Sequence, residues 1–488
     1  MSPTPTPEVS DQLLRHVTGA RWFGGKGRRA TVVSVTPLPW LTEPAGFADG
    51  AGPAVRMEVV EVAYLGPSAD EAAAADPAVA RDFYQLAVAY RPAPQAAMAH
   101  AEIGRWEDAE LGPAVAYDAT QDPEASAVLL RGLLAEQRLR DGEAEVAFHL
   151  SAAEGLRADL EPSVFRGQQS NTSVMFGEVA MLKLFRRLEL GRNLDIEVHD
   201  ALSRTGMADV ARLFGWAEAS WPAVDPATGG STTVSADLAM VVEKLAEATD
   251  GWDLALQALQ SGTSFAAEAK ALGAALAETH AALRQAFPTG RQPGTEVAAV
   301  MADRLSAACS VAPALEEHSA GLSQVFEALG AGELDVQRVH GDFHLGQTLH
   351  TPGGWKIIDF EGEPAKTLAE RVAPDSVWRD IAGMLRSFDY AKASVPGPDS
   401  QAWATECREA FLTGYAGGPL DPADAATLRA YEADKAVYEV VYEVRNRPEW
   451  VAIPLGALAA LTGHHQPDDA AAAAHPDRAA QRPADTKE

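Results

Sequence analysis

The spacing of apolar and polar side chains changes character along the chain. Between residues 11 and 105, short β-type runs such as 31–35 and 57–64, and the alternating run 82–91, are separated by connectors rich in Gly, Pro and Ala. Alternation with a period of two is typical of strands that bury one face. The pattern therefore predicts a small β-rich N-terminal module over residues 11–105.

Helical and β-type patterns are mixed from residue 106 to residue 247. Two β-type runs, 174–176 and 179–185, flank Gly177-Glu178. A Gly-X pair between such runs is typical of a hairpin, because glycine supplies the positive φ that the turn needs. We expect an α+β subdomain built around this hairpin.

Helical spacing dominates from residue 248 to residue 463, which predicts a helical C-terminal lobe. Its clearest segments are 265–287, 297–310, 403–415 and 428–445. The two ends of the chain, 1–10 and 464–488, combine Pro, Ala and charge and are expected to be disordered tails. The predicted fold class is therefore α+β, with a β-rich module, an α+β intermediate subdomain and a helical lobe.

Charge and cysteine content narrow the possible partners. The 488-residue chain has 40 Lys plus Arg against 69 Asp plus Glu, a formal net charge of -29. So acidic a surface repels a polyphosphate backbone, which argues against nucleic acid as a partner. Two cysteines, Cys309 and Cys407, cannot form a disulfide framework, and no apolar run suits a membrane span. We expect a cytoplasmic protein with no membrane partner.

The most informative motif lies in residues 339–363. Asp342 is followed five residues later by Gln347, and Asp359 follows a strand-like run. Kinase catalytic loops place an Asp five residues before an amide metal ligand, and a later Asp also binds metal. The spacing predicts Asp342 as catalytic base, with Gln347 and Asp359 as ligands of one or two Mg²⁺ ions.

A lysine on the predicted hairpin suggests the nucleotide site. Lys183 lies in an otherwise apolar run, where ATP phosphates would satisfy its charge. Before the hairpin come Ser170, Asn171, Thr172 and Ser173, which offer hydroxyls and an amide where protein kinases have glycines. No Walker A sequence is present, so a P-loop enzyme is excluded. A lysine on an edge strand that reaches solvent would have the same pattern.

Kinase lysines pair with a carboxylate on the next helix. Asn193 is a plausible N-cap, and an apolar stripe begins at Leu194. Glu197 is the candidate partner and Asp195 its competitor, although an exposed carboxylate on the helix would fit the same spacing.

The apolar run 238–245 resembles the strand that presents backbone groups to adenine. Glu243 and Leu245 are the candidates for these contacts. A generic buried strand would have the same composition.

A late helix places four chemically distinct side chains on one face. Asp434, Tyr438 and Tyr442 are spaced by four residues, and Arg445 follows by three. Two phenol rings with a carboxylate and a guanidinium would suit a sugar-binding wall. A solvated helix face with salt bridges would show the same spacing.

Residues 340–390 resemble the corresponding segment of actinobacterial maltokinases, which are relatives of the aminoglycoside phosphotransferases. The likeness extends to other parts of the chain: Arg21-Trp22-Phe23, Lys26-Gly27-Arg28, 169–171, 248–252 and 438–448. It implies a bilobal, protein-kinase-like fold with an extra N-terminal cap.

The same resemblance implies an activity. It is the transfer of the ATP γ-phosphate to the anomeric hydroxyl of maltose, and the maltose 1-phosphate formed feeds glycogen and α-glucan synthesis from trehalose-derived maltose. Trehalose synthase is the implied pathway partner, and a monomer is expected. His344 falls where maltose is expected, and His340 and Asp380 are implied to be structural.

Two other functions fit the residues. A kinase of the same fold could act on an aminosugar, an aminoglycoside or choline, although an amine acceptor would favour several convergent carboxylates. A kinase-like scaffold without activity would normally lack catalytic residues, whereas Lys183, Asp342, Gln347 and Asp359 are all present.

Overall fold

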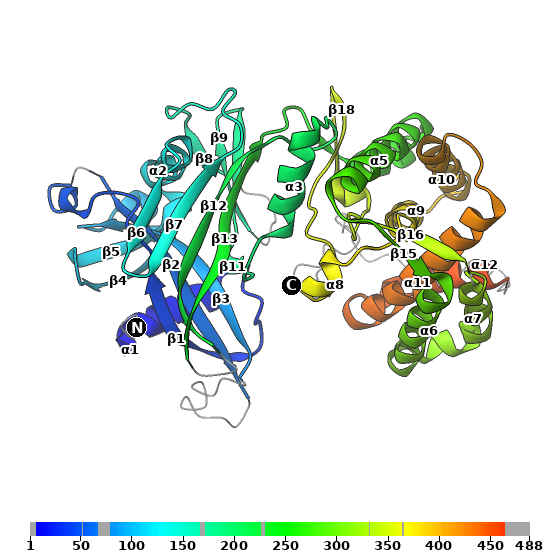
Figure 1. The fold of residues 1–488 in the computed structure, drawn as a ribbon, viewed down its shortest axis with the longest axis horizontal. Coiled ribbons are helices and arrows are strands. Elements are labelled where there is room, and N and C mark those ends of the chain that lie inside the picture. Colours follow the sequence, from blue (N-terminus) through cyan, green and yellow to red (C-terminus); the bar gives the residue numbers. More distant parts are fainter. Residues whose placement is uncertain are drawn as a thin grey trace. The chain divides into compact units, whose positions relative to one another are not determined.

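The computed structural model describes residues 6–50, 52–66, 79–165, 171–225, 230–330, 332–363 and 366–463 (Figure 1). These residues form two compact units. The first holds residues up to 200 together with 212–246, and the second holds 201–211 and the residues from 247 onward. The expected C-terminal tail lies outside the described residues.

A six-stranded antiparallel sheet, here called the cap sheet, begins the first unit. Its order is β1-β2-β3-β5-β4, and β11 also pairs with β3. The strands are β1 (Arg29–Pro37), β2 (Ala54–Leu65), β3 (Arg81–Arg91), β4 (Glu102–Asp108), β5 (Gly112–Asp118) and β11 (Arg187–Leu188). The sheet therefore extends beyond residue 105, the expected end of the cap.

Helix α1 (Pro7–Gly19) packs against the cap sheet and corrects the predicted N-terminal tail. Thr6 caps it by accepting a hydrogen bond from Val9 N, and Pro7 occupies its first turn, where proline is tolerated. Leu13 and Val17, one turn apart, are fully buried in the core of the cap sheet. Residues 7–10 are thus helical, because the apolar stripe anchors the whole helix.

The second sheet of the first unit has seven strands in the order β6-β7-β12-β13-β10-β9-β8. The strands are β6 (Arg138–Asp141), β7 (Ala144–Leu150), β8 (Pro162–Val164), β9 (Thr172–Phe176), β10 (Ala180–Leu184), β12 (Leu213–Val224) and β13 (Ser231–Glu243). Helix α2 (Pro123–Leu134) precedes the sheet in sequence, and α3 (Leu194–Thr205) follows β11.

The predicted hairpin is confirmed with a different turn. Phe176 pairs with Ala180, so three residues, 177–179, connect β9 and β10 instead of two. Gly177 has a φ of 55°, in the region that favours glycine.

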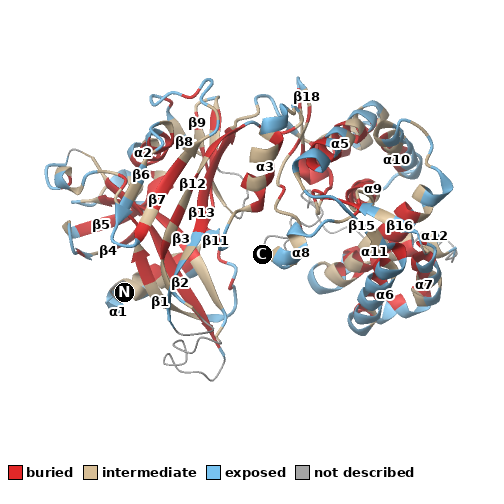
Figure 2. Ribbon diagram, in the orientation of Figure 1, coloured by how far each residue is buried: buried red, intermediate tan, exposed pale blue. Residues whose placement is uncertain are grey.

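Helices form most of the second unit. They are α4 (Gly251–Ser261), α5 (Ala266–Ala286), α6 (Gly294–Val311), α7 (Ser319–Glu327), α8 (Leu368–Val372), α9 (Trp378–Ser394), α10 (Ser400–Ala416), α11 (Pro422–Asn446) and α12 (Ala452–Thr462). Two small sheets accompany them: β14 (Thr249–Asp250) with β17 (Thr348–Thr351) and β18 (Gly354–Ile357), and β15 (Gly290–Pro293) with β16 (Glu333–Val336). Figure 2 shows the inner faces of α5 and α9 as buried.

Short 3₁₀ helices connect several elements. They are η1 (Pro44–Gly46), η3 (Ala96–Ala101), η4 (Ala119–Gln121), η5 (Pro313–His318), η6 (Leu345–Gln347) and η7 (Pro448–Trp450). Within the described ranges, no helix has both the length and the apolar character that crossing a bilayer requires. The β-rich N-terminal part and the helical C-terminal part confirm the predicted α+β class.

Candidate active site

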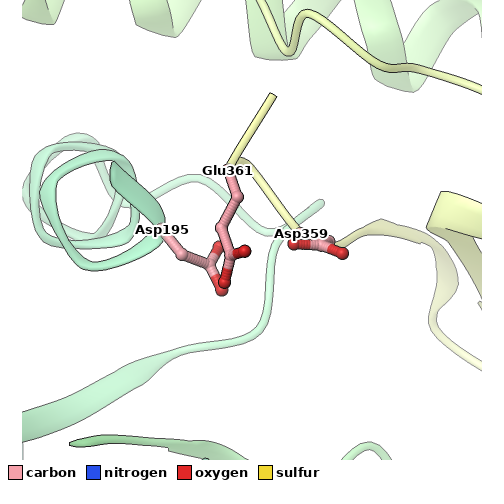
Figure 3. A group of neighbouring side chains, drawn as sticks. All are labelled: Asp195, Asp359 and Glu361. Carbon is pink, nitrogen blue, oxygen red and sulfur yellow. The ribbon is translucent and has the colours of Figure 1, made fainter. Parts of the chain in front are cut away.

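Lys183 lies near the end of β10, where it pairs with Ser173 on β9 and Met240 on β13. Its Nζ donates a hydrogen bond to Asp195 Oδ2 at 2.9 Å. Asp195 is buried in the first turn of α3 (Figure 3). A buried carboxylate holds this lysine in place, which is the arrangement expected of a phosphate-binding lysine in kinases.

The structure pairs Lys183 with Asp195, which was the alternative to the favoured candidate Glu197. Asn193 caps α3 by accepting from Asp195 N and Ile196 N, at 3.0 and 3.2 Å. Residues 195 and 197 are about 200° apart around a helix, so only one of them can face β10. His199, one turn after Asp195, places Nε2 at 3.5 Å from Asp195 Oδ1.

The predicted phosphate-loop residues divide between two faces of the hairpin. Ser173 lies opposite Lys183 and shares its face, because directly paired residues point the same way. Thr172 lies opposite Leu184 on the other face, where its hydroxyl accepts from Arg186 Nε at 2.8 Å. Asn171 is half-buried, and Ser170 lies outside the described residues.

The predicted adenine-binding segment is the end of β13. Glu243 is its last residue, and its backbone N–H donates to Arg212 O at 2.8 Å. A contact from Glu243 to adenine would therefore use the carbonyl oxygen. Leu245, half-buried, follows two residues later.

The loop that carries Asp342 is hydrogen-bonded to Asp380 on α9. His340 N and Gly341 N donate to the two carboxylate oxygens of Asp380, at 2.7 and 2.8 Å. Gly341 has a φ of 86°, which favours glycine. Gly383 lets the Phe343 carbonyl approach α9, since a Cβ at this position would lie 2.5 Å from that oxygen. The backbone around Asp342 is thus fixed by main-chain contacts.

Asp380 is fully buried and is kept ionised by its hydrogen bonds. His280 Nε2 donates to it at 2.9 Å, and Tyr415 donates to the other ring nitrogen of His280 at 2.8 Å. Burial alone would raise the pKa of Asp380, but the contacts with His280, His340 and Gly341 hold it below its usual value. An ionised Asp380 accepts strong hydrogen bonds from the loop.

Gln347 and Asp359 lie side by side. Gln347 Nε2 is 3.4 Å from Asp359 Oδ2. Asp359 has a φ of 68°, a conformation that costs a non-glycine residue energy and is often found at functional sites. His340 Nε2 donates to Ile358 O at 3.0 Å and so fixes the start of this loop, which also carries Glu361 (Figure 3). Carboxylate and amide oxygens are hard ligands, so this pair fits Mg²⁺.

The sequence interpretation did not identify Lys435, on α11, as a functional residue. Its Nζ donates to Asp342 Oδ1 at 3.4 Å and lies 3.8 Å from Glu363 Oε1. Burial alone would lower the pKa of Lys435, but Glu363 and Asp342 outweigh it and raise the pKa. The ammonium group is therefore charged beside Asp342. Lys435 precedes Tyr438 by three residues and therefore lies on the same side of the helix. This spacing is the feature of the sequence that could have identified Lys435.

Two of the four side chains of the predicted sugar-binding wall lie against each other. The rings of Tyr438 and Tyr442 stack with centroids 6.5 Å apart. Arg445, however, is exposed, and the guanidinium that lies over Tyr442 belongs to Arg447, at 5.4 Å. Arg445 lies in the last turn of α11, and its contact with the sugar stays a prediction.

Two other residues expected near the acceptor have local partners. Asp434 forms an ion pair with Arg304 of α6, although burial still raises the pKa of Asp434. The buried ring of His344 caps η6, with Nδ1 accepting from Gly346 N at 3.1 Å. A sugar contact from His344 remains a prediction.

Lys366 gives this region a pH dependence. Burial and nearby Arg379 lower the pKa of Lys366 to about 8, against the opposing charges of Glu363 and Asp375. A lowered lysine pKa destabilises the folded state below pH 8, and this penalty disappears as pH rises from about 8 to about 10.5. We predict that Lys366→Met increases the free energy of unfolding at pH 7 by roughly 2–3 kcal/mol. Denaturant titrations at pH 7 and 10 test this, since equal gains at both would contradict it.

Two parts of the chain match different family models. Residues 16–122 match the model of the maltokinase N-terminal cap domain, and residues 233–431 match that of the phosphotransferase enzyme family.

Two curated relatives are named glucosamine kinases. The protein from Streptacidiphilus jiangxiensis is 29% identical over 357 residues, which cover 66% of this chain and 78% of the relative. The protein from Mycolicibacterium smegmatis is 28% identical and covers 60% of this chain and 77% of the relative.

Solved structures give the fold. A glucosamine kinase in complex with glucosamine, ADP and inorganic phosphate aligns with a TM-score of 0.60 at 21% identity, over 94% of this chain and 100% of that chain. At this identity the likeness shows the fold alone. It confirms the predicted kinase-like architecture with an N-terminal cap.

Proposed function

Because residues 233–431 match the phosphotransferase enzyme family and residues 16–122 match the maltokinase N-terminal cap domain, we propose that the protein is a maltokinase. It transfers the γ-phosphate of ATP to the anomeric hydroxyl of maltose and releases ADP and maltose 1-phosphate. The phosphotransferase activity is common to the family, whereas the acceptor is specific to this proposal.

The observation that supports a neutral acceptor is the charge balance around Asp342. Arg379 pairs with Glu363 at 2.6 Å and with Asp375 at 3.1 Å. Together with the pairs described above, four carboxylates among the described residues are matched by four cations: Asp342 with Lys435, Glu363 with Lys366, Asp375 with Arg379 and Asp434 with Arg304. An ammonium acceptor needs a carboxylate to spare, and Lys435 would repel it. A sugar hydroxyl has no such requirement.

The residues of the second unit suit proton transfer from a hydroxyl. Asp342 would accept the hydroxyl proton as the oxygen attacks the γ-phosphorus. Lys435 would hold the Asp342 carboxylate in place and donate to an acceptor oxygen. Tyr438 and Tyr442 would stack on the sugar rings.

The nucleotide is assigned to other residues. Lys183, held by Asp195, would bind phosphate oxygens, and Gln347 with Asp359 would hold one or two Mg²⁺ ions. Bound Mg²⁺ supplies charge neutralisation at the phosphate oxygens. The product would enter α-glucan and glycogen synthesis, with trehalose synthase as the pathway partner.

A glucosamine kinase is the second candidate. It is favoured by the two relatives, whose names carry that activity and which share 28–29% identity with this chain. On this alternative, the acceptor ammonium would bind where Glu363 or Asp434 lies, with displacement of the cation that each now pairs with.

Steady-state kinetics with maltose and glucosamine separate the two candidates. We expect kcat/KM for maltose to exceed that for glucosamine by about 100-fold, because Lys435 disfavours a cation by roughly 2–3 kcal/mol at this range. Lys435→Gln should lower kcat/KM for maltose and narrow the gap. The matched control is Lys392→Gln, a lysine of α9 that pairs with Asp389. A wild-type preference for glucosamine would refute the maltokinase proposal and support the alternative.

A further inference from the structure

Arg186 is a buried cation that joins the cap sheet to the hairpin β9–β10. It lies between β10 and β11 and is 1% exposed. Its Nη2 donates to Asp118 Oδ2 at 2.5 Å and to Thr120 Oγ1 at 3.3 Å. Its Nε donates to Thr172 Oγ1, at the start of β9. One guanidinium thus contacts the end of β5, the helix η4 and the hairpin.

The carboxylate of this pair belongs to the cap. Asp118 ends β5 and caps η4, accepting from Thr120 N at 3.0 Å. Burial alone would raise the pKa of Asp118, but Arg186 and Thr120 outweigh it and lower the pKa. The Asp118 carboxylate is therefore ionised at neutral pH. Buried charges held in this way fix one geometry, because leaving either unpaired is costly.

A second set of contacts fixes the backbone at the same place. Gln85 of β3 donates its side-chain Nε2 to Phe185 O at 3.1 Å and to Leu238 O at 3.0 Å. Its backbone N–H donates to Arg186 O at 2.8 Å. Strand β11 then pairs with β3. The chain that leaves Lys183 is thereby held by the cap within three residues.

Side chains of the hairpin β9–β10 point to two opposite faces, and Arg186 and Lys183 lie on different ones. Lys183 and Ser173 share one face, and Thr172 and Leu184 share the other. Arg186 contacts the face of Thr172, so it can act on Lys183 only through the backbone of β9 and β10. Arg186 is in this sense a positioning residue.

From these contacts we propose that the N-terminal cap positions the nucleotide-binding hairpin through the buried Asp118–Arg186–Thr172 chain. The proposal rests on the assignment of ATP to this hairpin. In this proposal the cap contributes to the affinity for nucleotide as well as to the fold. We therefore predict that weakening the Asp118–Arg186–Thr172 contacts raises the Kd for nucleotide and leaves the KM for the acceptor sugar unchanged.

The test is a double-mutant cycle on Asp118→Asn and Thr172→Val, with the Kd for Mg·ADP measured by calorimetry and KM values by kinetics. Each single variant is expected to raise the Kd for Mg·ADP and the KM for ATP roughly tenfold, as loss of a charge-assisted hydrogen bond allows. KM for the sugar should stay within about twofold. The double variant should resemble either single variant, because both act through one guanidinium.

Asp122→Asn is the matched control. Asp122 is another buried carboxylate at the end of η4, but it pairs with Arg91 inside the cap, at 2.6 Å. It is expected to lower Tm without changing the Kd for Mg·ADP. If Asp118→Asn lowers Tm by a similar amount and keeps the wild-type Kd, the proposal is refuted. Equal losses of affinity in Asp118→Asn and Asp122→Asn would also refute it.

If Asp118→Asn does not fold, Thr172→Val, which keeps the ion pair, decides alone. A wild-type protein that phosphorylates no sugar but binds Mg·ADP contradicts the proposed function and leaves this test valid. A wild-type protein that does not bind Mg·ADP contradicts both.

Discussion

Replacement of Asp342 by Asn is expected to lower kcat about 1,000-fold while the Kd for Mg·ADP stays within about twofold. A positioned general base contributes roughly 10²–10⁴-fold to the rate, and the amide cannot accept the proton. The loop should keep its shape, because it is held by Asp380 and Arg379, which the substitution does not touch. Coupled-assay kinetics and calorimetry on the same preparation measure the two quantities.

Asp335→Asn is the control for this variant. Asp335 lies seven residues upstream on β16, is exposed and pairs with Arg291 at 3.3 Å. Its kcat should match that of the wild type. Retention of more than a tenth of wild-type turnover by Asp342→Asn would contradict the role of Asp342 as base.

Replacement of Lys183 by Met should reduce kcat/KM for ATP at least 100-fold. The substitution removes the cation proposed to bind phosphate oxygens and leaves Asp195 buried beside His199 without its lysine. Unpaired buried charge also destabilises, so we expect a loss of roughly 3 kcal/mol in the free energy of unfolding. Asp195→Asn combined with Lys183→Met should restore stability but not activity.

Lys244→Met provides the comparison. Lys244 follows β13 in the same unit and pairs with Glu178 in the exposed hairpin turn, at 2.6 Å. Surface ion pairs contribute little to stability, so the free energy of unfolding should change by less than about 1 kcal/mol. The value of kcat/KM for ATP should change by less than about twofold. If Lys244→Met and Lys183→Met reduce kcat/KM alike, the assignment of Lys183 to the phosphates is wrong.

The local parts of the fold were predictable because their signals are local. The hairpin around Gly177 and the cap residue Asn193 follow from residues within one turn of each other. The exact turn was not predictable, since its third residue is set by the register of β10 against β13 as well as β9. Helix α1 was missed because its apolar stripe gains stability only from the distant cap sheet.

In the candidate site, too, the local features were predictable and those that depend on distant contacts were not. The order of Asp342, Gln347 and Asp359 was visible as spacing, and the contact between Gln347 and Asp359 agrees with it. The choice between Asp195 and Glu197 depended on which side of α3 faces β10, which the apolar stripe alone did not decide. Lys435 was missed because its partners Asp342 and Glu363 are more than 70 residues away in sequence. Arg447 was missed because it follows the end of the helix.

The most direct test of the account is the structure of the product formed from maltose and ATP. The purified protein is incubated with both and Mg²⁺, and the mixture is followed by phosphorus and proton NMR. We predict stoichiometric ADP and a phosphate coupled to the anomeric proton of the reducing glucose. A phosphate on any other position, or turnover of glucosamine with none of maltose, would contradict the account.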